Sequence, residues 1–197
     1  MAETLIRRMT LPAVDTIKDR LFGGFATSPS TEDEYAVTVY CPRDELESIL
    51  DELGFSSSLL SALKISLYGN VEDGSWVRRE SVLADEQLHV VSHERGDSAA
   101  IDLYAHQELS KITHPVKHYR KVDYDAEAGV TRFRDALDDY RQRVDDPPKC
   151  EIQPPRHRPW AWALHLLSFV STPAAARLGR TLDDFEARVR SRLTGKG

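Results

Sequence analysis

The amino-acid sequence predicts an α+β fold, in which an antiparallel sheet is packed on one side by amphipathic helices and followed by a helical C-terminal extension. Residues 87–108 alternate apolar and polar side chains on both sides of a Gly-Asp pair, which is the pattern of a β-hairpin. Between residues 130 and 144 the apolar side chains instead recur every three or four positions, as on a helix that buries one face. Residues 35–41 are rich in β-branched and aromatic side chains, which predicts an additional strand.

The first half of the chain carries helix signals on both sides of this strand. A helix is expected to open near Pro12 and to end at Gly23-Gly24, before a loop rich in Ser, Thr and Pro over residues 26–34. After the strand, Pro42 is expected to begin a second helix, because apolar residues then recur at helical spacing: Leu46, Ile49, Leu50 and Leu53. Gly54 is a natural end for it.

The middle of the chain predicts a meander of three to four antiparallel strands between residues 65 and 108, with turns at 70–74, at 84–86 and at Gly96-Asp97. Just before it, residues 56–63 can form a short helix, although residues 63–68 can equally begin a strand. After the meander, Pro115 fits the first turn of a short helix. Asp123 or Asp125 can cap the longer helix that follows, and Pro147-Pro148 ends it.

The last third of the chain predicts a division into parts. Residues 1–146 form the α+β core domain, and residues 147–159 form a proline-rich linker that holds no regular element. Residues 160–197 form the helical extension, which includes a helix over 181–193. Its segment 160–170 is apolar nearly all round but too short to span a bilayer. A buried core helix is the preferred interpretation, and docking to a partner chain, self-association or a membrane surface are the alternatives.

Composition limits the class of protein. Of the 197 residues, 41% are hydrophobic and 29% charged, as in an ordinary globular protein that is long enough to bury a core. The formal net charge of −6 does not favour nucleic-acid binding, which usually requires a basic excess. Cys41 and Cys150 match no metal-binding spacing. No apolar leader follows the first charges, so we expect a cytoplasmic protein.

The register of the hairpin decides which side chains it presents. If Gly96-Asp97 is a two-residue turn, His89 lies opposite Tyr104 and Gln87 lies opposite His106. One face is then apolar, with Leu88, Val90, Ile101, Leu103 and Ala105. The other face collects polar side chains around Val91: His89, His93, Asp102, Tyr104 and His106. Such a face is often open to water in an antiparallel sheet, and solvent-facing histidines require no function.

The same face also supports chemistry. His89, Asp102 and His106 are within reach of one another, and they form either an acid–base group or the ligand set of a divalent metal such as zinc. Residues that can complete a binding site are Tyr104, His93, His114, His118, Lys117 and Arg120. His114 and His118 are four residues apart and would share a helix face.

Two basic stretches bear on the choice of substrate. Basic residues gather around Tyr119, namely Lys111, Lys117, His118, Arg120 and Lys121, and Arg78-Arg79 forms a shorter group. Each is also typical of a solvated surface. If both lay beside the histidine face, an RNA-acting enzyme would become attractive.

These patterns leave three functions open. The sequence favours a binding or regulatory protein without catalysis, because no motif identifies a catalytic site. The first alternative is a small histidine-dependent or metal-dependent hydrolase acting on a phosphodiester or RNA. The second is a peripheral membrane or assembly factor anchored by the C-terminal segment.

Overall fold

The computed structural model describes residues 29–58, 65–66, 72–95 and 99–153, together with the single positions Leu178, Thr181, Phe185 and Arg188. Four predicted features therefore lie outside the described residues: the helix after Pro12, the Gly96-Asp97 turn, the apolar segment 160–170 and, except for three positions, the helix at 181–193.

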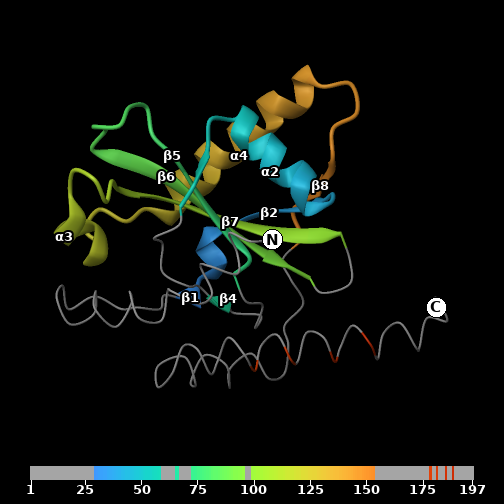
Figure 1. Ribbon diagram of the computed structural model, residues 1–197, viewed down its shortest axis with the longest axis horizontal. Coiled ribbons are helices and arrows are strands. Elements are labelled where there is room, and N and C mark those ends of the chain that lie inside the picture. The colour runs from blue at the N-terminus through green and yellow to red at the C-terminus, as the bar shows by residue number, and fades with distance from the viewer. Residues whose placement is uncertain are drawn as a thin grey trace.

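The described residues form an antiparallel sheet of six strands with helices on one face, which confirms the α+β prediction (Figure 1). The strand order is β3-β5-β6-β7-β2-β8. The bounds are Tyr35–Tyr40 for β2, Ser56–Ser57 for β3, Gly74–Arg78 for β5, Glu86–Glu94 for β6, Ala100–Leu109 for β7 and Lys149–Glu151 for β8. Helices α2 (Arg43–Glu52) and α4 (Ala126–Arg143) pack together on this sheet, and the short helix α3 (Pro115–Tyr119) lies at one end of it.

Both long helices begin and end for local reasons. Helix α2 starts directly after Pro42, and it ends before Gly54, whose φ of 79° is a conformation that glycine adopts without strain. At the start of α4 the Asp125 side chain accepts a hydrogen bond from the Ala128 amide at 2.9 Å. Asp125 is therefore the cap, whereas Asp123 has a φ of 57° in the preceding turn.

The hydrophobic core lies between the helices and one face of the sheet. Its sheet residues include the predicted apolar face of the hairpin, Leu88, Val90, Ile101, Leu103 and Ala105. Leu46, Ile49 and Leu50 enter from α2, and Val130, Phe133 and Leu137 enter from α4. Burial of these apolar side chains supplies the main driving force for the fold.

Helix α4 rests directly on strand β7 at Gly129. A Cβ atom at this position would lie 2.1 Å from the Cα of His106 and 2.5 Å from the amide nitrogen of Gln107. Both neighbours are backbone atoms, which cannot turn aside as a flexible side chain can. The absence of a side chain at Gly129 therefore sets how closely the helix approaches the strand.

Four expectations for the ends of the sheet are wrong. Residues 65–66 form β4 (Ile65–Ser66), which pairs in parallel with β1 (Pro29–Ser30) in a separate two-stranded sheet and does not begin the meander. Residues 56–57 are the edge strand β3 and not a helix. The predicted loop contains the 3-10 helix η1 (Glu32–Glu34), and β6 already begins at Glu86, where a turn was expected.

A fifth correction concerns the proline-rich segment. The expectation that it holds no regular element is wrong for β8, which pairs with β2 at the edge of the sheet. An edge strand leaves one row of backbone groups unpaired, so prolines are tolerated beside it. Within the described parts of the chain, no helix is long and apolar enough to cross a bilayer.

Candidate metal centre

The pairing of β6 with β7 sets the geometry of the polar face. His89 lies opposite His106, His93 opposite Asp102, and Gln87 opposite Glu108. The predicted register is therefore wrong by two residues, because the hairpin closes with the Arg95 amide bonded to the Ala100 carbonyl and not with a two-residue turn. A shift of two preserves the alternation of side chains, so the predicted division into an apolar and a polar face is confirmed.

The side chains of the polar face are buried, which answers a question that the sequence left open. His89 is 6% exposed, His106 is 1% exposed and Glu108 is 7% exposed. His93, Asp102 and Tyr104 are fully buried on the same face. Burying so many polar groups is costly unless each one has hydrogen-bond or charge partners.

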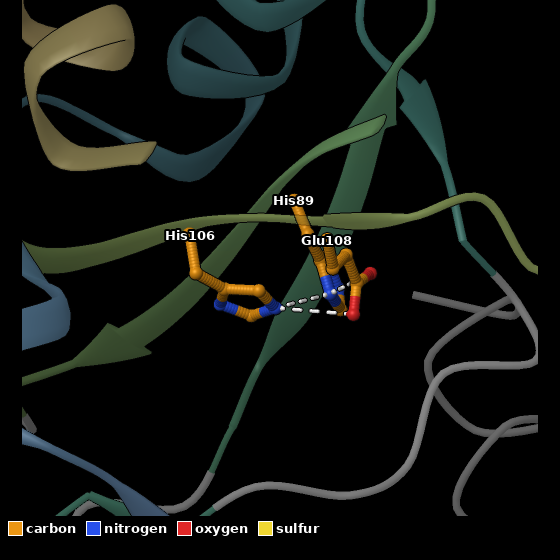
Figure 2. Close-up of side chains that lie close together, drawn as sticks. All are labelled: His89, His106 and Glu108. Carbon is orange, nitrogen blue, oxygen red and sulfur yellow. Dashed lines mark hydrogen bonds and ion pairs between the residues drawn. The ribbon is translucent and has the colours of Figure 1, made fainter. Parts of the chain in front are cut away.

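Three of these side chains converge at one point, His89 from β6 and both His106 and Glu108 from β7. Figure 2 shows them on the side of the sheet away from the helices. The His89 Nδ1 atom lies 3.1 Å from His106 Nε2 and 3.1 Å from Glu108 Oε1, and His106 Nε2 lies 3.5 Å from Glu108 Oε2. The two imidazole rings meet edge to face, with centroids 4.7 Å apart.

These separations match the spacing of ligands around a tetrahedral zinc ion. Zinc–ligand bonds of about 2.0–2.1 Å place neighbouring ligand atoms about 3.3 Å apart. The described residues offer one such group of potential ligands, His89, His106 and Glu108. Two imidazoles and one carboxylate are the ligands of many catalytic zinc sites, where water or substrate takes the fourth position.

Each of the three side chains has a further partner that orients it. His106 Nδ1 lies 3.1 Å from Glu34 Oε1, although the N–H direction departs from that of a hydrogen bond. His89 Nε2 lies 2.6 Å from the Ser75 hydroxyl, and Gln87 Nε2 donates to Glu108 Oε1 at 2.7 Å. Such outer partners orient the ligating side chains in metal sites.

Glu34 itself is held rigidly. It is 1% exposed at the end of η1, and its Oε2 atom accepts a hydrogen bond from the Thr31 amide at 2.6 Å. The capping box of this short helix thus fixes a carboxylate that comes from a distant part of the chain.

The protonation of Glu108 follows from its neighbours. Burial raises the pKa of this carboxyl group, but the charge interactions and hydrogen bonds with His89 and His106 outweigh burial. The pKa of Glu108 consequently lies well below its usual value, and the group stays ionised.

Two residues near α3 complete the surroundings of the cluster. His118 Nδ1 lies 3.4 Å from Glu108 Oε2 and 2.9 Å from the Leu109 carbonyl oxygen. Tyr124 stacks on His106 with ring centroids 4.4 Å apart. The turn between α3 and α4 therefore lies against the candidate centre.

Asp102 does not join the two histidines. Its carboxylate accepts hydrogen bonds from Arg95 Nε at 2.7 and 2.9 Å and from the Thr38 hydroxyl at 2.7 Å. Arg95, Thr38 and Tyr35 also donate to the Gln153 carbonyl oxygen, so this network fastens the chain beyond β8 to the sheet. The arrangement satisfies a buried charge within the chain and serves the structure.

The remaining candidate residues are dispersed. His93 lies 3.3 Å from the Ser30 hydroxyl, and its ring meets the Tyr104 ring edge to face. In the sheet, the residue pair that contains His93 is the next one on this face after the pair that contains Tyr104. His114 pairs with Asp85 at 2.9 Å, and Lys117 and Arg120 are exposed.

Two residues of the cluster were not predicted from the sequence. Glu108 was missed, although it continues the alternation that places His106 on the face. Glu34 was missed because nothing local connects it with the hairpin.

Comparisons of the chain with protein-family models, with curated proteins and with solved structures found no match.

Proposed function

We propose that this protein is a metal-dependent hydrolase in which His89, His106 and Glu108 hold one zinc or similar divalent ion. The observation that carries the proposal is the convergence of three side chains in a buried place: His89 Nδ1 and His106 Nε2 lie 3.1 Å apart, and the two Glu108 carboxylate oxygens lie 3.1 and 3.5 Å from these nitrogens. A cation of the right size satisfies all three side chains at once.

The distribution of protons among these side chains supports a cation at this point. The Glu34 carboxylate beside His106 Nδ1 favours a proton on that nitrogen, which leaves the Nε2 lone pair directed at His89. In the metal-free protein, His89 Nδ1 must then carry a proton, because this nitrogen faces two acceptors, the His106 Nε2 lone pair and the Glu108 carboxylate. A bound ion displaces this proton, and the Ser75 hydroxyl can turn from donor to acceptor to suit the new tautomer.

The ligand set also favours catalysis over a purely structural role. A bound zinc ion would polarise, at its fourth position, a water molecule or a carbonyl or phosphoryl oxygen of the substrate. Glu34, Ser75 and Gln87 would hold the three ligating side chains in place. His118 lies close enough to Glu108 to exchange a proton near the same position.

Metal titration tests the proposal. We expect protein stripped with a chelator to bind one zinc ion per chain by isothermal titration and elemental analysis. His89→Gln and His106→Gln should abolish binding, whereas the control His114→Gln, whose side chain pairs with Asp85, should bind normally. If stripped and folded wild-type protein takes up no zinc, manganese or iron, the proposal is wrong, whatever the variants do.

The functions expected from the sequence without a metal stay predictions. A specific feature favours the non-catalytic interaction protein: Val82 is 72% exposed and Leu83 is 76% exposed between β5 and β6. A role of the C-terminal segment in self-association or at a membrane surface concerns residues outside the described part. Sedimentation of wild type and Leu83→Ser would show whether the exposed pair holds two copies together.

A further inference from the structure

Two cationic segments lie beside the candidate centre, the arrangement under which an RNA-acting enzyme becomes attractive. In the first segment, Arg79 follows β5, is half-buried, and donates from Nε to Gln87 Oε1 at 2.9 Å. Gln87 in turn donates to Glu108 at 2.7 Å. One side chain thus separates the guanidinium group from a proposed metal ligand.

In the second segment the cations belong to α3 and the turn after it. His118 of α3 lies 3.4 Å from Glu108, and the exposed residues Lys117, Arg120 and Lys121 surround it in sequence. The Lys121 ammonium lies 5.1 Å from the centre of the Tyr124 ring, which stacks on His106. This segment therefore connects surface cations to the second proposed ligand.

Two neighbouring acidic groups are already engaged. Asp85 pairs with His114 at 2.9 Å, and Glu86 accepts from Gln107 Nε2 at 2.8 Å. Among the described residues, the terminal nitrogens of Arg79 have no hydrogen-bond partner. A planar guanidinium fork in this position matches the geometry of phosphate oxygens.

We propose that the substrate is a phosphodiester, an inference that rests on the proposed hydrolase function. A phosphodiester keeps one negative charge, which the cations of the two segments would bind while the metal would polarise a phosphoryl oxygen. The oxygen of one water molecule forms a bond to phosphorus as the bond to the leaving oxygen breaks. One proton of that water ends on the leaving oxygen, so water is the sole co-reactant.

The zinc-loaded protein tests this inference with three chromogenic substrates: bis(p-nitrophenyl) phosphate, p-nitrophenyl phosphate and p-nitrophenyl acetate. We expect the diester to be hydrolysed fastest relative to the zinc-catalysed background. Arg79→Gln should reduce kcat/KM for the diester by about 10- to 100-fold, the usual loss for a hydrogen bond to a charged group. Zinc affinity and acetate hydrolysis should change less than about twofold.

Matched variants separate binding from structure. Arg79→Lys should restore part of the diester activity, because it keeps the charge but not the fork. The control Arg143→Gln, at the exposed end of α4, should behave as wild type. Short single-stranded RNA, single-stranded DNA and phospholipid vesicles then identify which natural diester is cleaved.

The possible failures are distinguishable. Hydrolysis of the acetate alone, or an Arg79→Gln variant with full diester activity, overturns the phosphodiester inference and leaves the hydrolase proposal standing. Zinc binding without hydrolysis of any substrate overturns the hydrolase proposal and this inference together. Failure to bind metal overturns the centre itself.

Discussion

The two faces of the central sheet are equally buried, but their side chains are stabilised in different ways. The face toward α2 and α4 carries Leu88, Val90 and Leu103 and is complete once the helices pack on it. The opposite face carries His89, His106 and Glu108, which are no more than 7% exposed and require charge or hydrogen-bond partners. Burial alone therefore does not identify a core, because the chemistry of the buried atoms decides what they need.

The polar face itself contains two solutions to this requirement. Asp102 receives a guanidinium group, Arg95, from the same chain, and its charge is fully compensated. The histidine cluster receives instead a second carboxylate, Glu34, so that two acids and two imidazoles share a confined space. The first arrangement is complete without a ligand, and the second depends on protons or on a metal ion.

The largest expected effect separates the apolar face from the polar one. Phe133 is fully buried between α4 and the sheet, so Phe133→Ala should lower the free energy of unfolding by about 3–5 kcal/mol. The loss should be the same with zinc and with a chelator, because this face contains no ligand. Chemical denaturation under both conditions measures it, and a strongly zinc-dependent loss would show that the faces are not energetically separate.

A smaller effect is expected within the polar face. Glu34→Gln removes the carboxylate beside His106 Nδ1 and should weaken zinc binding by about 10- to 100-fold, as loss of an outer-shell partner usually does. The matched control is Glu32→Gln, because Glu32 is an exposed neighbour in η1. Competition with a chromophoric chelator measures both affinities, and equal affinities would leave Glu34 with a structural role only.

The smallest expected effect is on the stability of the protein at low pH. Because the pKa of Glu108 is lowered in the folded protein, its ionised form stabilises the metal-free protein at every pH above the unfolded value of about 4.3. That contribution should be lost as pH falls below this value, through the lower pKa of the folded state. Glu108→Gln should show a shallower decline of stability in this range, measured by thermal unfolding, and an unchanged slope would contradict the assignment.

Most of the sheet and both long helices could be predicted from the sequence because their signals are local. The apolar spacing from Val130 to Leu137 and the alternation in β6 and β7 each repeat over several turns or residue pairs. The strands β3, β4 and β8 have only two or three residues, and their pairing depends on distant partners. Local pattern indicated a strand only at residues 63–68, which contain β4, and it indicated none of these pairings.

The sequence could predict which face of the sheet carries the candidate centre, but not all of the residues that form it. Alternation alone places His89 and His106 on one side of the hairpin, and it would have added Glu108 if continued by one step. Choosing between Asp102 and Glu108 as their neighbour required the exact register, which a shift of two residues changes while leaving the faces intact. Glu34 is brought close by the fold as a whole.

The close contact at Gly129 has a consequence for how the molecule transmits a disturbance. Helix α4 and the backbone of His106 touch without an intervening side chain, so neither can shift without moving the other. A change at the polar face that displaces the His106 backbone therefore also displaces a helix on the far side of the sheet. One residue without a side chain thus brings the helix into direct contact with the strand that carries the polar face.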